Sequence, residues 1–160
     1  MKRAFIIPLT AIGLAACNDS KKATAIPKKF VASIEAFSGT SSRVELAADG
    51  GVTYLYNPRT FTAWEGTERT GIPIPPERWI AFRKQLDSAK VWSWQRKYDN
   101  PNIADGTVWQ FEIIYADRKI SSEGSNAYPS KEQFEAVRAA VQELIGGKSF
   151  PDRPIWYHED

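Results

Sequence analysis

Cysteine and histidine are almost absent from this sequence, with one of each in 160 residues. A single cysteine, Cys17, cannot form an internal disulfide. His158 is the only imidazole, so we expect no histidine-based metal site or catalytic triad, and we predict neither metal nor cofactor. The sequence also lacks a glycine-rich phosphate loop and a GxSxG nucleophile motif. These absences exclude the commonest nucleotide-binding and serine-hydrolase sites.

The sequence also carries no excess of positive or negative charge from Cys17 onward. Of the 21 basic residues, Lys2 and Arg3 precede Cys17 in a stretch without acidic residues, and the remaining 19 match the 19 acidic residues. A chain balanced in this way has no electrostatic footprint for nucleic acid, so we expect no nucleic-acid partner. Its length and its 42% hydrophobic content are those of one globular domain.

No apolar stretch is long enough to span a bilayer as a helix. Residues 4–14 are apolar apart from Thr10, but about eleven residues fall short of a hydrocarbon core of ~30 Å. The stretch follows Lys2 and Arg3, as the apolar region of a secretory signal does. We therefore predict that residues 1–16 are a signal peptide.

The predicted signal ends in Leu14-Ala15-Ala16-Cys17. This run resembles the lipobox of bacterial lipoproteins, in which an aliphatic residue and two small residues precede an invariant cysteine. The resemblance implies that a diacylglycerol is attached to the Cys17 sulfur and that cleavage occurs between Ala16 and Cys17. It also implies acylation of the new amino group, typically by palmitate. Two or three acyl chains anchor a protein stably to a membrane.

The residue after the cysteine bears on localisation. In the enterobacterial sorting rule, aspartate directly after the lipidated cysteine retains a lipoprotein in the inner membrane. Here Asn18 takes that place and Asp19 follows one residue later. The rule therefore implies the periplasmic face of the outer membrane. The rule varies between bacterial groups, so the inner membrane stays open as an alternative.

Beyond the signal, composition divides the chain into three further parts. Residues 17–29 are polar, rich in lysine and without periodicity, which is typical of a flexible tether. Residues 30–149 carry alternating and helical patterns and are predicted to form a single domain. Residues 150–160 form an aromatic tail, in which we expect Ile155 or Trp156 to pack back on the domain. The alternative for the tail is a docking peptide.

The domain is predicted to be α+β, with an antiparallel sheet of about five to six strands and two helices packed on one face. An Asp-Gly turn at 48–51 predicts a hairpin, and a Ser130/Gln133 capping box predicts the start of the second helix. The expected strands lie near 30–37, 44–46, 52–56, 60–65, 107–115 and 119–122, and the expected helices near 76–89 and 130–145.

Aromatic and polar side chains between the two helices supply the candidate binding site. If residues 90–94 are extended, both indoles of that stretch lie on one face and form a shallow aromatic surface for a sugar ring or a partner side chain. The alternative is that these rings fill the core. The candidate binding residues are Trp92, Trp94, Tyr98, Asp105, Asn126 and Tyr128.

Residues 90–145, with the runs Tyr98-Asp99-Asn100 and Asp105-Gly106-Thr107-Val108-Trp109, loosely resemble small bacterial lipoprotein domains of unassigned activity. That resemblance assigns no activity to any residue here. We predict a non-enzymatic, lipid-anchored domain that binds an envelope component, either glycan or protein. Two alternatives remain: a hydrolase of cell-wall material that uses carboxylates near Asp99 and Asp105, and a structural or inhibitory partner of another envelope protein.

Overall fold

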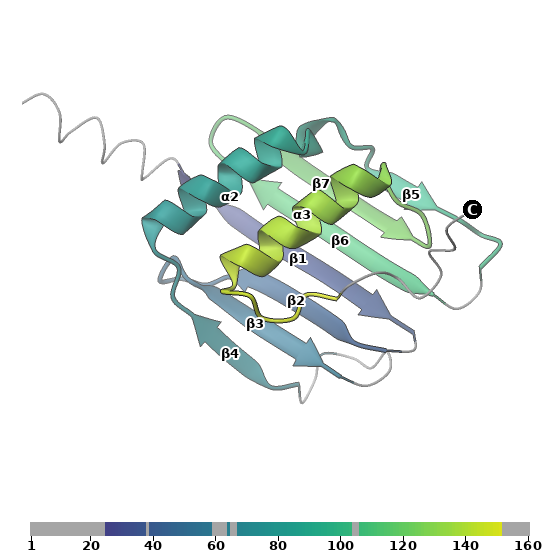
Figure 1. Cartoon of the computed structure of the whole chain (residues 1–160), viewed down its shortest axis with the longest axis horizontal. Coiled ribbons are helices and arrows are strands. Elements are labelled where there is room, and N and C mark those ends of the chain that lie inside the picture. The colour runs from purple at the N-terminus through teal and green to yellow at the C-terminus, as the bar shows by residue number, and fades with distance from the viewer. Residues whose placement is uncertain (1–24, 38, 59–63, 65–66, 104–105, 152–160) are drawn as a thin grey trace, which may run out of the picture.

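A computed structural model describes residues 25–37, 39–58, 64, 67–103 and 106–151. This part of the chain forms an α+β fold in which two helices lie across one face of a seven-stranded sheet (Figure 1). The elements in chain order are β1 (Lys29–Ala36), β2 (Ser41–Leu46), β3 (Val52–Asn57), β4 (Arg69–Ile72), α2 (Pro76–Ser88), the 3-10 turn η1 (Val91–Ser93), β5 (Lys97–Asp99), β6 (Thr107–Ile114), β7 (Lys119–Ser125) and α3 (Lys131–Leu144). The α+β class and the two helices are confirmed.

The sheet is mixed, and the prediction of an antiparallel sheet of five to six strands was wrong. Its strand order is β4-β3-β2-β1-β6-β7-β5. All neighbours are antiparallel except β5, which runs parallel to β7 at the edge. A strand of three residues is too short to display a period-two pattern, so no alternation of residue types marks β5.

The predicted hairpin between β2 and β3 is confirmed, and its turn shows why the sequence signal is strong. Gly50 has a φ of +84°, a conformation that glycine adopts without steric cost. The Asp49 carboxylate accepts a hydrogen bond of 2.9 Å from the Gly51 backbone N–H. The Trp79 indole of α2 donates to the Gly50 carbonyl at 3.0 Å. The turn is therefore fixed both locally and against the helix layer.

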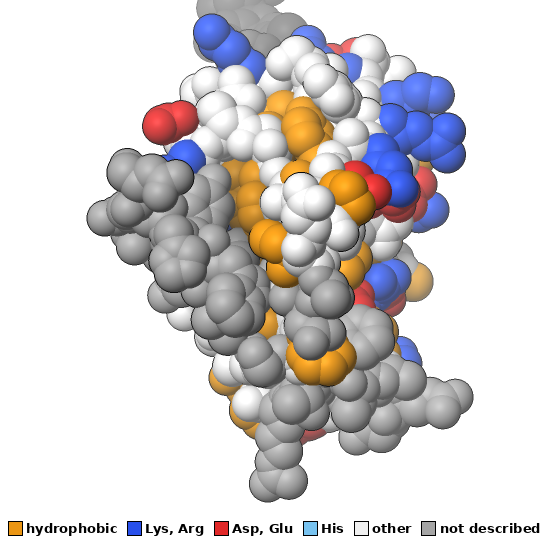
Figure 2. All heavy atoms as spheres, turned by 90° about the vertical axis from the view of Figure 1, so that its right-hand side faces the viewer, with side chains coloured by type: hydrophobic (Ala, Val, Ile, Leu, Met, Phe, Trp, Pro, Cys, Tyr) orange, Lys and Arg blue, Asp and Glu red, His pale blue; other side chains and the backbone are white. Residues whose placement is uncertain are grey.

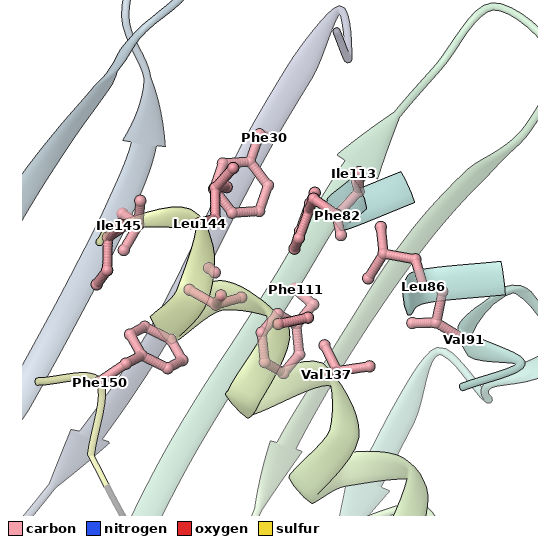
Figure 3. Packing of buried hydrophobic residues seen from close by; sticks show 14 of the residues in the cluster. Phe30, Phe82, Leu86, Val91, Phe111, Ile113, Val137, Leu144, Ile145 and Phe150 are labelled. Carbon is pink, nitrogen blue, oxygen red and sulfur yellow. The ribbon is translucent and has the colours of Figure 1, made fainter. Parts of the chain in front are cut away.

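The core lies between the helices and the sheet. Phe30 of β1 and Phe111 of β6 face the helices because alternate strand residues point to one side. Figure 3 shows side chains from both helices and the sheet pointing toward one another across this layer. The two helices contribute the fully buried stripe residues Trp79, Phe82, Leu86, Phe134, Val137, Val141 and Leu144.

Both ends of α3 follow the predicted signals. The Ser130 hydroxyl accepts a hydrogen bond from the Gln133 backbone N–H at 3.3 Å, as an N-cap does. Gly146 and Gly147 follow the helix with φ of +75° and +80°. The left-handed conformation ends the helix and turns the chain back toward the sheet.

The folded unit extends beyond the predicted limits of 30 and 149. Ala25 is buried, and the Lys28 backbone N–H donates to the Ile114 carbonyl at 2.6 Å. Residues 25–29 therefore belong to the domain rather than to the tether. At the other end, Phe150 is buried in the core. The predicted packing of Ile155 or Trp156 lies outside the described residues, as does most of the strand expected at 60–65.

Candidate functional site

The two candidate indoles do not form a shared surface, because the segment that carries them is not extended. Lys90 has a φ of +54° and residues 91–93 form the turn η1. The turn abolishes the period of two, so the indoles point in different directions. Trp94 is buried, and its Nε1 donates to the Gln133 side chain at 3.1 Å. Trp92 is half-buried on the other side, where its Nε1 donates to Asp87 at 2.7 Å. The expectation of an extended segment was wrong.

The other candidate rings surround Trp109 in the core. Trp109 is fully buried, and its ring centroid lies 5.8 Å from that of Tyr98 and 6.2 Å from that of Tyr128. The position opposite Trp109 on β7 is Gly124, where a Cβ atom would lie 2.2 Å from the indole Nε1. The rings therefore form a packed cluster that stabilises the end of the sheet, and glycine is required to admit the indole.

Asn126 and Asp99 have local structural roles. The Asn126 carbonyl oxygen accepts from the Thr107 N–H at 2.7 Å, and its amide donates to the Ile103 carbonyl at 3.1 Å. This side chain therefore connects the segment before β6 to the end of β7. Asp99 forms an exposed ion pair with Lys97 at 3.6 Å. Asp105 lies outside the described residues, so the structure does not place it with either of them.

Arginine, aspartate and aromatic side chains form a cluster between α2 and the turn that joins β6 to β7. The Arg83 guanidinium lies over the Tyr115 ring, 4.3 Å from its centroid, and its other partner is Asp117 at 2.7 Å. The hydrogen bond from Arg83 lowers the pKa of Asp117. Trp92 completes the cluster, with both Arg83 and Arg118 over its ring. Each charge is paired here, so the cluster serves to join α2 to the β6–β7 turn.

The Tyr115 hydroxyl supplies a test of this cluster. The residue is only 3% exposed, and its hydroxyl has no hydrogen-bond partner among the described residues. An unsatisfied buried hydroxyl costs about 1–3 kcal/mol. We therefore expect Tyr115→Phe to raise the free energy of unfolding by about 1 kcal/mol in urea denaturation at pH 7. A loss of stability would show that the hydroxyl has a partner.

The same variant should change how the melting temperature depends on pH above about pH 8. Burial raises the pKa of Tyr115 above its usual value, so the folded state favours the neutral hydroxyl. That preference stabilises the protein below the unfolded tyrosine pKa of about 10 and is lost as the pH rises above it. Melting temperatures measured from pH 8 to 11 should therefore fall less steeply for Tyr115→Phe than for the parent.

The face of the sheet opposite the helices has both buried and accessible side chains. These side chains come from alternate positions of the strands, and the pairing places them in rows across the sheet. One row runs from Leu55 and Arg43 through Ser33, Gln110 and Glu123 to Lys97 on the edge strand. Leu55 and Ser33 are buried, so the accessible polar part of this row lies at Gln110, Glu123 and Lys97.

A hollow of about 340 Å³ lies on this face at the end of the sheet farthest from residue 25. Glu35 is six residues along β1 from Lys29, so the hollow lies roughly 20 Å from the start of that strand at ~3.3 Å per residue. We call it the distal hollow. It is lined by residues of β1, β5, β6 and β7, namely Ser33, Glu35, Lys97, Tyr98, Val108, Trp109, Gln110, Glu123, Gly124 and Ser125.

The distal hollow is bordered by one exposed hydrophobic side chain and one half-buried ring. Val108 is 47% exposed and pairs with Glu35 across β1 and β6. Tyr98 is half-buried and lines the same hollow, whereas the exposed Phe37 follows the end of β1 and is not part of the lining. The Trp64 indole donates to the Glu35 carboxylate at 3.3 Å. Figure 2 shows hydrophobic side chains exposed at this end of the molecule.

Two groups in the distal hollow have unused hydrogen-bonding capacity. Among the described residues, neither the Gln110 amide nor the Glu123 carboxylate makes a side-chain hydrogen bond or ion pair. They face each other as a cross-strand pair between β6 and β7. An amide both donates and accepts, whereas a carboxylate accepts only. Together they present a donor and several acceptors to any ligand.

A second hollow of about 370 Å³ lies on the same face toward the start of β1 and shares Gln110 with the distal hollow. Here the charges are already paired. Lys29 contacts Glu112 at 2.8 Å, and Arg43 contacts Glu45 on the neighbouring position of its own strand face. Because its charged groups satisfy one another, this hollow offers less to a ligand than the distal hollow does.

Among the candidate binding residues named from the sequence, only Tyr98 lines the distal hollow, and its polar residues were not predicted. The signal available was the alternation of β6, which separates Gln110 and Glu112 from the buried aromatic positions. That pattern predicts the face of Gln110, but the neighbours of β6 are set by pairing with β1 and β7. Only the strand order brings Glu35 and Glu123 to the same surface.

Within the described ranges, no group of three or more histidine, cysteine, aspartate or glutamate side chains is placed to hold a metal ion. None of the helices in those ranges is long and apolar enough to cross a membrane.

No protein-family model matches the sequence, and no curated protein matches it significantly. The candidate site is therefore defined by its own geometry.

Proposed function

We propose that this chain is a lipoprotein of the bacterial cell envelope, anchored through lipid on Cys17, whose domain binds an envelope component without catalysis. The observation that carries the proposal is the run Leu14-Ala15-Ala16-Cys17, which places the sole cysteine at the end of a signal-like segment. A lipid-bearing thiol needs no partner cysteine, and the small residues before it fit a signal peptidase site. The proposed location is the periplasmic face of the outer membrane.

The position of the domain's first strand supports this arrangement. β1 begins at Lys29, and its pairing with β6 puts the start of the domain at the end of the sheet opposite the distal hollow. The distal hollow therefore lies at the end of β1 farther from the proposed lipid anchor. Lys28 and Lys29 lie on the side of the anchor, where cations favour anionic headgroups.

The anchoring is tested by replacing the thiol. We expect Cys17→Ser to leave an unprocessed precursor without lipid, because the acyl chain is attached to sulfur. Intact-mass spectrometry of the purified protein measures both cleavage and acylation. A parent protein with a mature N-terminus and no lipid would contradict the proposal.

The sorting is tested with a neighbouring substitution that leaves the thiol intact. Asn18→Asp places aspartate directly after the lipidated cysteine, and we expect it to move the protein from the outer to the inner membrane fraction on a density gradient. An unchanged distribution would mean that this sorting rule does not operate on the chain.

Pull-down from an envelope extract tests the alternative that the domain is a structural or inhibitory partner of another envelope protein.

A further inference from the structure

We propose that the distal hollow is a binding site for a short saccharide. This inference rests on the proposed function, because it specifies the envelope component that the domain would bind and the surface that would bind it. The hollow lies on a rigid part of the fold, with Glu35, Gln110 and Glu123 on three adjacent strands, β1, β6 and β7. Side chains on paired strands hold a fixed spacing, which favours a ligand with repeated polar groups.

The hydrogen-bonding groups match the hydroxyl groups of a sugar. A sugar hydroxyl donates one hydrogen bond and accepts others, so it needs an acceptor and a donor close together. Glu123 supplies the acceptor, and the Gln110 amide beside it supplies both. Lys97 lies across from Glu123 on β5, and its ammonium group, which is 3.6 Å from Asp99, carries further N–H groups that can donate to a ligand. These three groups come from neighbouring strands, so one pyranose ring can contact more than one of them.

The rim supplies the apolar contact that a sugar ring also requires. The two faces of a pyranose ring expose C–H groups, which pack on aromatic and aliphatic surfaces. Val108 is exposed beside Glu35 and has no part in the core. The half-buried ring of Tyr98 lines the same hollow and supplies an aromatic surface. The combination of exposed apolar rim and polar floor is typical of small-ligand sites.

The charge and size of the hollow favour a saccharide over a protein partner. Glu35, Glu123 and Lys97 give mixed charge rather than one strong sign, so the hollow lacks the complementarity that steers a charged protein surface. A volume of about 340 Å³ lies at the lower end of the range of small-molecule pockets. It is suited to one or two sugar rings.

The test is a calorimetric titration of the full chain, purified in detergent, with chitotriose and with cellotriose. We expect at least one trisaccharide to bind, and Glu123→Gln to weaken that binding at least tenfold, as loss of a charge-assisted hydrogen bond does. Glu123 makes no side-chain hydrogen bond or ion pair among the described residues, so its substitution should leave the melting temperature unchanged. Val108→Ser, which removes the exposed apolar group of the hollow, should also weaken binding.

Glu112→Gln is the matched control. Glu112 lies on β6 two residues from Gln110 and faces the same side, but in the second hollow. Its substitution removes the same charge and should leave the affinity within twofold of the parent. Absence of binding by both trisaccharides, or equal affinity in Glu123→Gln and the parent, would overturn the saccharide site. A protein captured through this surface while neither sugar binds would overturn it too.

Lipid anchoring and saccharide binding are tested by independent measurements. Lipid anchoring is measured by mass spectrometry at Cys17, whereas saccharide binding is measured by titration in detergent. A failed titration leaves the lipoprotein assignment intact. An unlipidated N-terminus leaves the affinity of the distal hollow interpretable.

Discussion

Replacing Val141 with aspartate should unfold the domain. Val141 lies on the buried stripe of α3 and is fully enclosed. A carboxylate at this position would lose its hydration and gain no counter-ion, because the core cluster around it is hydrophobic. An uncompensated buried charge costs roughly 3–5 kcal/mol. Loss of the buried valine contacts adds about 1.5–3 kcal/mol. The combined cost of roughly 4.5–8 kcal/mol is comparable to the total stability of about 5–15 kcal/mol that a small domain has, so far-ultraviolet circular dichroism at 37 °C should show a largely unfolded chain.

Ala139→Asp is the matched control for this substitution. Ala139 lies on the same helix but is exposed, so the new carboxylate stays in water. We expect its melting temperature to remain within a few degrees of the parent. If Val141→Asp melts like Ala139→Asp, the packing of α3 against the sheet is wrong.

Trp109→Ala should cost about 3–5 kcal/mol of unfolding free energy, the usual range for deleting a buried large ring. The indole is fully buried, and its Nε1 donates to the Ala127 carbonyl at 2.8 Å. Its ring contacts five others, those of Trp94, Tyr98, Phe111, Tyr128 and Phe134. Because Gly124 offers no side chain to fill the space, the cavity cannot close from the β7 side.

Trp92→Ala is the comparison for Trp109→Ala. Trp92 is half-buried, and its main contacts are the ring of Tyr115 and two guanidinium groups. Its removal should cost about 1–2 kcal/mol, since exposed cation–π contacts contribute about 0.5–1 kcal/mol each. Urea denaturation of both variants provides the measurement. Equal losses would mean that both indoles belong to one core.

The fold was predictable from the sequence wherever a local pattern was long. The stripe of α3 repeats over four turns, and Ser130 caps it in the predicted way. The alternation of β6 separates Trp109 and Phe111 from Gln110 over eight residues. Such patterns record which side of an element is buried, and burial is the main determinant of both helix and strand position.

The segment after α2 was misread because its pattern was short and a single residue broke it. A period of two from residue 90 to 94 holds only if Lys90 is extended, but Lys90 adopts the left-handed conformation at the end of the helix. Composition carries no information about that choice, since it depends on how α2 ends against the sheet. The turn that begins at Lys90 therefore sends Trp92 to Tyr115, just after β6, and Trp94 to Trp109 and Phe111 within β6.

The candidate site was not predictable for a different reason. Glu35, Gln110 and Glu123 lie far apart in the chain, and each alone is an ordinary residue on a solvated strand face. Their proximity follows from the insertion of β6 between β1 and β7. No local pattern encodes strand order, so only the three-dimensional arrangement brings the three side chains together.

The two outermost strands have a consequence for how copies of the chain behave at high density. β4 has four residues and β5 has three, and charged side chains stand on both, Arg69 on β4 and the Lys97–Asp99 pair on β5. Short, charged edges present few unpaired backbone groups to a neighbouring sheet, which blocks edge-to-edge polymerisation. Proteins tethered to a membrane are confined to two dimensions and collide often. These edges would let such a population crowd together without merging into fibres.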